Sequence, residues 1–229
     1  MKIGIVVAMD KELVQLKALL DHATVEKRGN RDFVTGRVGP CDVVLQKCGI
    51  GKVNAAIGAV EMIGNYSPDL IVSSGVAGGA DTEMNVADVV VGTHYVYHDA
   101  YCGSDCLYGQ VAGMPPSFAA PVALVQKALA LEGCPIHAGL IASGDWFVDS
   151  REKMRGIVER FPMVKAVDME SAAIAQTCHV YGLPFVSFRI ISDIPLKDNK
   201  AQQYFDFWAR MAEGSFDVTR KFLFSIYNL

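Results

Sequence analysis

The sequence predicts an α/β fold, a three-layer sandwich in which helices flank a central, largely parallel mixed sheet. Two observations predict this class. Short apolar runs of strand length alternate along the chain with segments of helical character. The apolar runs are nearly continuous, which is typical of parallel strands buried on both faces. Helices placed between such strands cover both faces of one sheet.

Seven apolar runs are the expected strands. In chain order they are 2–8 ("KIGIVVA"), 42–46 ("DVVLQ"), 69–75 ("DLIVSSG"), 88–97 ("DVVVGTHYVY"), 138–143 ("AGLIAS"), 166–169 ("AVDM") and 185–192 ("FVSFRIIS"). Helices are expected at 10–20, 52–64, 119–132, 150–160, 170–181 and 203–227. In the last of these, "YFDFWARMA" spaces its large apolar residues as a core-facing helix does. The irregular segment 98–118 is expected to be a functional loop, long enough to reach a site or a neighbouring subunit.

Composition limits the function classes. The chain has 229 residues, of which 51% are hydrophobic and 20% charged, so it can bury one sizeable core, and we expect a single domain over residues 1–229. The formal net charge is -4 and Lys and Arg form no run, which argues against a nucleic acid or an anionic membrane as partner. A small molecule is the expected partner.

The cysteines predict a reduced, metal-free protein. All six are scattered, with no C-x-x-C pair and no Cys/His cluster at zinc spacing. The N-terminal "MKIGIVVAM" reads as a first strand rather than a signal peptide, and no segment has the roughly 18 apolar residues of a membrane helix. We therefore expect a cytoplasmic protein.

Acidic residues follow several of the expected strands. In open α/β sheets, ligands bind outside the carboxyl ends of the strands. The first strand is followed by Met9 and Glu12, and the run 185–192 is followed by Asp193. The stretch "VDMES" supplies Met169 and Glu170 in the same way. We expect Glu12, Glu170 and Asp193 to lie at one rim of the sheet.

Each of these residues also has a purely structural interpretation. Glu12 can favour the positive end of a helix dipole, and Asp193 can be a turn or cap residue. Asp168 and Glu170 can form a salt bridge and a cap. His98, beside Asp99, is expected to be a loop or core histidine rather than a catalytic base.

Arg189 and two glycine-rich turns add further constraints. Arg189 lies inside an apolar run, and a guanidinium in a buried strand needs a carboxylate or a ligand. By strand alternation Arg189 shares a face with Ile191 and Asp193. The turns "CGIGK" and "GVAGG" can be simple strand-to-helix turns, and the first lacks the spacing of a phosphate-binding P-loop.

Seven motifs, taken together and in order, carry a family resemblance. They are "KIGIVVAMDKE", "GIGKVNAA", "SSGVAGGA", "YHDA", "ASGDWFV", "VDMESAAIA" and "RIISD". The chain resembles the bacterial 5'-methylthioadenosine/S-adenosylhomocysteine nucleosidases of the nucleoside phosphorylase superfamily. This resemblance implies hydrolysis of the N-glycosidic bond, which releases adenine and a 5-thioribose product in methionine salvage and methyl-cycle recycling. It further implies a homodimer that needs neither a metal nor an organic cofactor.

The resemblance also implies roles for individual residues. Glu12 would activate the attacking water, Asp193 would protonate N7 of the leaving adenine, and Arg189 would lie near the water. Glu170 would bind the ribose hydroxyls, with Met169 against the sugar. The complete substrate-binding set that it implies is Met9, Ile50, Val76, Ala77, Gly78, Phe147, Val148, Met169, Glu170 and Ser192. Asp168 receives no role beyond support of the turn.

The choice of nucleophile is a separate prediction. Phosphorylases of this superfamily hold phosphate with arginines, whereas the corresponding regions here read "AMDKE" and "SSGVAGG". A carboxylate at Glu12 would repel an anion, which favours water. Val76 stands where a hydroxyl-bearing Ser is common among such nucleosidases. The alternatives are a phosphate-dependent nucleoside phosphorylase, a catalytically idle nucleoside-binding protein and a futalosine-type nucleosidase. The futalosine-type alternative stays open because the sequence does not identify which residues of 98–118 and 194–208 line the 5' pocket, with Tyr108, Tyr204 and Phe205 as candidates.

Overall fold

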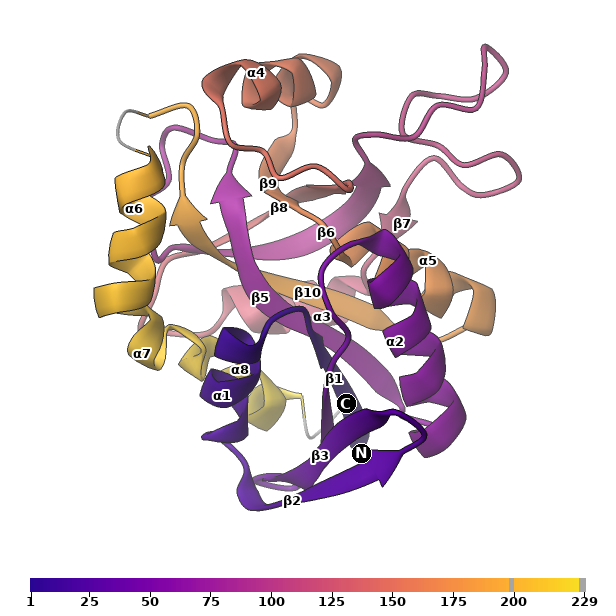
Figure 1. Ribbon diagram of the computed structural model, residues 1–229, viewed down its shortest axis with the longest axis vertical. Helices are drawn as coiled ribbons and strands as arrows, with labels where there is room; N and C mark the ends of the chain where they lie inside the picture. The colour runs from indigo at the N-terminus through magenta and orange to yellow at the C-terminus, as the bar shows by residue number, and fades with distance from the viewer. Residues whose placement is uncertain (198–199, 227–229) are drawn as a thin grey trace.

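A mixed sheet of ten strands forms the centre of the molecule. The computed structural model describes residues 1–197 and 200–226 (Figure 1). The strands are β1 (Lys2–Val7), β2 (Asp21–Arg28), β3 (Arg31–Val38), β4 (Cys41–Lys47), β5 (Leu70–Gly79), β6 (Val89–Tyr97), β7 (Phe118–Ala119), β8 (Ile136–Ser143), β9 (Val164–Asp168) and β10 (Phe185–Asp193). Their order is β10-β6-β8-β9-β5-β1-β4-β3-β2, with β7 paired to β6. The predicted α/β class is confirmed.

Parallel pairing joins most of the strands that the sequence predicts. The pairs β1–β4, β1–β5, β5–β10, β6–β8 and β8–β9 are parallel, whereas β5–β9 and β6–β10 are antiparallel. Strand β5 pairs with β1, β9 and β10, so β5, β10, β6, β8 and β9 close into a ring. This closure brings the ends of β5, β9 and β10 together.

Helices flank the sheet. They are α1 (Asp10–Lys17), α2 (Lys52–Tyr66), α3 (Val122–Leu129), α4 (Arg151–Arg160), α5 (Ser171–Tyr181), α6 (Lys200–Asp206), α7 (Ala212–Ser215) and α8 (Asp217–Ser225), with a π-helical segment η1 (Phe207–Met211). In Figure 1, α2 and α5 lie together on one side of the sheet, whereas α1, α6 and α8 lie on the other. Among the described residues, no helix is both long and apolar enough to cross a membrane.

The structure differs from the prediction in three elements. An antiparallel hairpin, β2–β3, lies at the sheet edge, where β2 is too polar and exposed to read as a buried strand. The two-residue strand β7 ends the loop 98–118, which otherwise has neither helix nor strand. The helix predicted at 203–227 is divided into α6, η1, α7 and α8: the backbone is π-helical over Phe207–Met211, and the helix is interrupted at Phe216, two residues after Gly214, whose φ is 81°. Its last residue, Tyr227, lies outside the described residues.

Candidate active site

One pocket lies at the carboxyl ends of β1, β5, β9 and β10. Its lining residues are Ala8, Met9, Glu12, Ile50, Val76, Ala77, Gly78, Trp146, Phe147, Val148, Val167, Asp168, Met169, Glu170, Ser192, Asp193 and Tyr204. These residues come from segments far apart in the sequence. The four strand ends converge because β5 pairs with β1, β9 and β10. Four carboxyl groups therefore share one concave site.

Glu12 is held in place by backbone amides. It lies in the first turn of α1 and is 2% exposed. Its Oε2 accepts hydrogen bonds from the N–H groups of Ala8 and Met9, each at 2.9 Å, and its Oε1 accepts one from Val76 at 3.0 Å. Burial raises the pKa of Glu12, and the positive charge of Arg189 and the three amides oppose that rise. Glu12 is thus an oriented carboxylate with increased basicity.

Asp168, which lines the pocket, forms a buried ion pair with Arg189, which does not line it. The Nε of Arg189 donates to Oδ2 of Asp168 at 2.5 Å, and its Nη2 donates to the Ser73 hydroxyl at 2.9 Å. Asp168 also accepts hydrogen bonds from the hydroxyls of Ser143 and Ser171, each at 2.5 Å. Burial disfavours the charged form of Asp168, but Arg189 and these hydroxyls outweigh burial and lower its pKa. Asp168 is therefore a fixed anion that satisfies the buried guanidinium.

The pKa of Glu170 is shifted in the opposite direction to that of Asp168. Glu170 occupies the N-cap position of α5 without a side-chain capping bond and is 7% exposed, and its Oε1 accepts a hydrogen bond from the backbone N–H of Gly51 at 2.9 Å. Burial and the nearby charge of Asp168 raise the pKa of Glu170 to about 7. This carboxyl group changes its ionisation near neutral pH.

Asp193 lies at the end of β10. It is 4% exposed, and its Oδ1 accepts a hydrogen bond from the hydroxyl of Ser192 at 2.8 Å. The pairing of β10 with β5 shifts register between Ile191 and Asp193. Strict strand alternation is broken at this bulge, and Ser192 and Asp193 both line the pocket.

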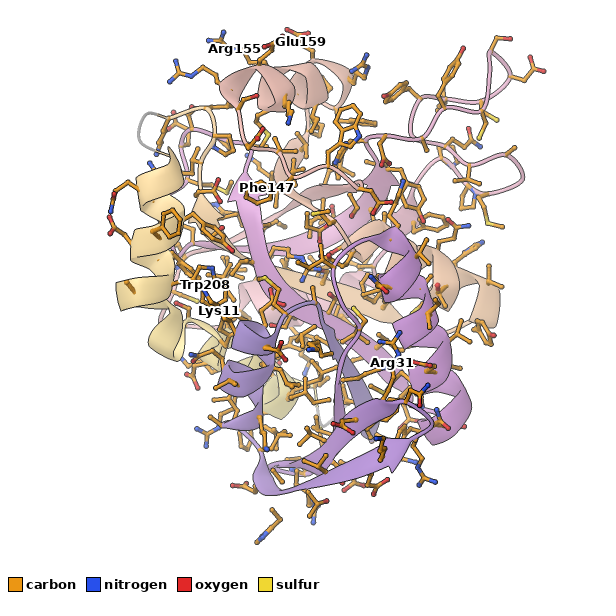
Figure 2. The ribbon with its side chains drawn as sticks, viewed as in Figure 1. Lys11, Arg31, Phe147, Arg155, Glu159 and Trp208 are labelled. Carbon is orange, nitrogen blue, oxygen red and sulfur yellow. The ribbon has the colours of Figure 1, made fainter. Side chains whose placement is uncertain are left out.

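An aromatic rim borders the opening of the pocket. Phe147 and Trp146 follow β8 and are 60% and 49% exposed. The ring of Phe147 meets that of Tyr204, from α6, edge to face at 6.3 Å. Figure 2 shows Phe147 near the tip of β5, on the side of α6. Exposed aromatic faces beside a polar pocket floor suit a flat heteroaromatic ligand.

Comparison with known proteins gives the family. A family model described as the phosphorylase superfamily matches residues 2–223. A 5'-methylthioadenosine/S-adenosylhomocysteine nucleosidase of Desulfotalea psychrophila is 38% identical over 222 residues, which cover 95% of each chain. Another, from an Exiguobacterium species, is 41% identical over 211 residues, or 90% of each chain. The chain belongs to this nucleosidase family of the phosphorylase superfamily.

The solved structures agree with the nucleosidase fold. The Streptococcus pneumoniae 5'-methylthioadenosine/S-adenosylhomocysteine nucleosidase, solved with the transition-state inhibitor MT-ImmA, is similar with a TM-score of 0.91 and 33% sequence identity. The match covers 97% of this chain and 98% of that one. The family resemblance that the motifs predict is confirmed.

Most of the predicted site residues line the nucleosidase pocket. Met9, Glu12, Ile50, Val76, Ala77, Gly78, Phe147, Val148, Met169, Glu170, Ser192 and Asp193 are among the lining residues. Arg189 is not among the lining residues. Its guanidinium lies beside Glu12 and close to Gly75: a Cβ on Gly75 would be 2.6 Å from Oε1 of Glu12 and 3.0 Å from Nη1 of Arg189. Strand alternation predicted that Arg189 and Asp193 share a face of the sheet. That prediction assumed a regular strand, whereas the pairing of β10 with β5 shifts register between Ile191 and Asp193.

Sequence reasoning did not assign Ala8, Trp146, Val167 and Asp168 to the pocket, and it left Tyr204 open. Ala8, Trp146 and Asp168 each adjoin a predicted site residue, and Val167 lies two residues before Met169, so these sequence neighbours were the available signal. Tyr204 comes from a distant helix, and no local pattern could place it. Among the described residues, no group of three or more His, Cys, Asp or Glu side chains is arranged to hold a metal ion.

Proposed function

We propose that this protein hydrolyses the N-glycosidic bond of 5'-methylthioadenosine and S-adenosylhomocysteine. The observation that carries the proposal is the composition of the pocket. It contains the carboxyl groups of Glu12, Glu170 and Asp193 beside an aromatic rim, and its described lining residues include neither Lys nor Arg. Cleavage through an oxocarbenium-like state needs a proton for the leaving base and a water on the opposite face of the sugar.

Glu12 is the proposed general base. Its raised pKa brings the carboxylate closer to the pKa that suits proton transfer near neutral pH. As the water oxygen forms its bond to C1', Glu12 takes a proton from that water. The amides of Ala8, Met9 and Val76 hold the carboxylate in one orientation, which reduces the entropic cost of aligning it. Arg189, buried beside it, acts as a positioning residue.

Asp193 is the proposed general acid. It transfers a proton to N7 of adenine as the C1'–N9 bond breaks, so the base leaves neutral. The hydroxyl of Ser192, at 2.8 Å, orients the acid. Phe147 and Val148 are proposed to hold the adenine ring beside it.

Glu170 is the proposed ribose ligand. An ionised carboxylate accepts hydrogen bonds from both ribose hydroxyls, and Met169 packs against the sugar. Met9, Ile50 and the backbone of residues 76–78 complete the wall around the sugar and its 5' substituent. Ile50 is 50% exposed, so the 5' end of the pocket is open enough for a long thioether substituent.

Water, rather than phosphate, is the proposed acceptor. The pocket contains four carboxyl groups, and its described lining residues include neither Lys nor Arg. A phosphate anion in this pocket would therefore be repelled by the ionised carboxylates without a cationic side chain to offset the repulsion. The test incubates purified protein with methylthioadenosine in phosphate-free buffer, where we expect adenine and free 5-methylthioribose at the full rate. Recovery of a ribose 1-phosphate, or a rate that needs added phosphate, would overturn the proposal.

We also propose a single catalytic domain over residues 1–229 that assembles as a homodimer in the cytoplasm. One continuous sheet supports the single domain. The six free cysteines suit a reducing compartment. The homodimer is supported by exposed apolar residues along α2 and α5, namely Val53, Ile57, Val60, Val180 and Tyr181.

A further inference from the structure

Three sequence motifs meet beside the pocket without a role in the proposed mechanism. Lys52 of "GIGK" begins α2, Asp99 of "YHDA" follows β6, and Asp145 of "SGDW" follows β8. The Nζ of Lys52 donates to both carboxylate oxygens of Asp99 at 2.8 Å and lies 3.7 Å from Oδ2 of Asp145. We call these three residues the Lys52 clamp.

Backbone hydrogen bonds tighten the clamp. The N–H of Lys52 donates to Oδ1 of Asp145, and the N–H of Asp145 donates to Oδ2 of Asp99, each at 2.8 Å. The side chain of Asp99 is only 8% exposed and that of Lys52 27%. The Lys52–Asp99 pair is therefore less screened by solvent than a surface ion pair, whereas the side chain of Asp145 is 48% exposed.

The clamp connects two walls of the pocket. On one side, Gly51 immediately precedes Lys52 and donates its N–H to Glu170 at 2.9 Å. Gly51 has φ 96°, and a Cβ there would lie 2.9 Å from Oδ1 of Asp145. On the other side, Asp145 precedes Trp146 and Phe147, which form the aromatic rim. A shift at Lys52 therefore moves the ribose ligand and the base-holding segment together.

The buried ring of His98 packs against the segment that contains Gly144 and Trp146. His98 is 2% exposed, and neither ring nitrogen has a hydrogen-bond partner among the described residues. Its ring lies 5.6 Å from that of Trp146, and a Cβ on Gly144 would lie 2.4 Å from its Cε1. The His98 ring thus packs against the turn at Gly144, and the Lys52 clamp holds the next residue of that turn, Asp145, through hydrogen bonds.

We propose that Lys52 is a positioning residue for glycosidic cleavage, which acts through Asp99 and Asp145 to hold Glu170 and the aromatic rim at their working separation. This inference rests on the proposed nucleosidase activity. Lys52 itself is absent from the pocket lining, so its effect passes through the backbone of Gly51 and through Asp145.

The test compares Lys52→Met with Asp99→Asn. These substitutions change the local charge in opposite directions but break the same clamp. We expect both to lower kcat/KM for methylthioadenosine roughly 10- to 100-fold. We also expect both to move the acidic limb of the kcat/KM profile to higher pH, because loss of the Gly51 N–H raises the pKa of Glu170. Lys52→Arg, which can still pair with Asp99, should recover most of the activity.

Charge alone predicts a different result. The charged and titratable groups around Glu170 are Asp168, Arg189, Glu12 and Cys48. If Lys52 and Asp99 merely added their charges to this set, Lys52→Met would raise the pKa of Glu170 and Asp99→Asn would lower it. Limbs that move in opposite directions, or unchanged kinetics in both variants, would overturn the inference.

A matched control is Lys47→Met. Lys47 ends β4, which leads into the same turn, and its Nζ pairs with Asp10 at 2.7 Å on the surface. This variant should leave the profile unchanged, and an equal loss in it would overturn the inference. In parallel, calorimetry measures the binding of a nucleoside analogue with a non-cleavable glycosidic bond. If the wild-type protein binds this analogue but releases no adenine from methylthioadenosine, the proposed function alone is refuted. Weaker binding of the analogue by both clamp variants than by the wild type would still support the positioning role of Lys52, and equal binding would refute that role.

Discussion

Asp168 and Glu170 of the pocket have pKa values displaced in opposite directions by their immediate neighbours. Arg189 and two serine hydroxyls keep Asp168 ionised despite its burial. Glu170, two residues further on, lacks a direct cationic partner among the described residues, and burial raises its pKa to about 7. Asp168 and Glu170, two residues apart, thus differ in the direction of their pKa shifts because Asp168 contacts a guanidinium and Glu170 a single backbone amide.

Glu170→Gln is expected to stabilise the protein while reducing its activity. The folded pKa of about 7 exceeds the ordinary value of 4.5, so stability is lost as pH rises from about 4.5 through 7. Gln cannot ionise and can still accept the Gly51 N–H. At about pH 8 we expect the free energy of unfolding to rise by up to about 3 kcal/mol, and near pH 4.5 the gain should largely vanish. Urea titration at both pH values measures it, and a variant less stable than wild type at pH 8 would contradict it.

The substitution Asp193→Asn tests the proposed role of Asp193 as the general acid. The amide has the same size and can donate a hydrogen bond to N7, but it cannot transfer a proton. We expect kcat to fall by roughly 10²–10⁴, with a much smaller change in substrate affinity. Steady-state kinetics and binding measure the two effects. A nucleoside whose leaving group needs no proton should recover much of the rate, and an equal loss on that substrate would show that Asp193 is a structural cap.

At the scale of elements, β5 passes close to Glu12 and Arg189. Gly75 lies where β5 crosses Glu12 and Arg189, and no side chain fits between them. The C-terminal helices close the far side of the pocket. Tyr204 of α6 reaches Phe147, and Trp208 of η1 lies under the Nζ of Lys11 at 5.1 Å, as labelled in Figure 2.

Gly75→Ala is expected to damage both activity and stability. The added methyl group would lie 2.6 Å from Oε1 of Glu12, which three amides hold in place. We expect kcat/KM to fall at least roughly 10²-fold and stability to fall by about 1–3 kcal/mol. Gly64→Ala is the control, because Gly64 is exposed in α2 and its Cβ would meet nothing within 4 Å. Kinetics and thermal melting compare the two variants, and equal effects would refute the role of Gly75.

At the scale of the whole molecule, the exposed apolar residues of α2 and α5 surround one groove. Lys52, Val53, Ala56, Val60, Tyr97, Ala173, Gln176, Thr177, Val180 and Tyr181 line it. Val53 is 70% exposed and Val180 61%. In Figure 1 this face adjoins the irregular loop 98–117, so a partner placed here could also reach the loop. Exposed apolar side chains gathered around one groove favour burial against a second copy.

Light scattering should therefore give twice the chain mass of 24.8 kDa at assay concentration. Val53→Asp should shift the protein towards monomer, because dimerisation would bury an unpaired carboxylate. Val122→Asp is the matched control, since Val122 is 71% exposed at the start of α3, away from the groove. A monomeric wild type, or equal dissociation of both variants, would contradict the proposed dimer.

The sequence by itself determined seven of the ten strands in their order along the chain and three carboxyl groups of the pocket, and the family resemblance of its motifs supplied most of the other lining residues. Buried strands need continuous apolar runs, and the residues that follow such runs lie at the ligand-binding edge, so Glu12, Glu170 and Asp193 could be named as site residues without knowledge of the strand order. Local patterns also predicted one continuous C-terminal helix, since helical spacing persists through the π-helical segment η1 and across the break at Phe216, which follows Gly214 with its φ of 81°.

Tertiary structure alone decided which of these residues meet. Asp168 pairs with Arg189, which lies 21 residues away in sequence, and Lys52 reaches Asp99 and Asp145 from other elements. These contacts depend on which strands are neighbours and on where a bulge changes the direction of a side chain. Both are set by the closure of β5 onto β9 and β10 through hydrogen bonds between distant segments, and no periodicity within one segment encodes that pairing.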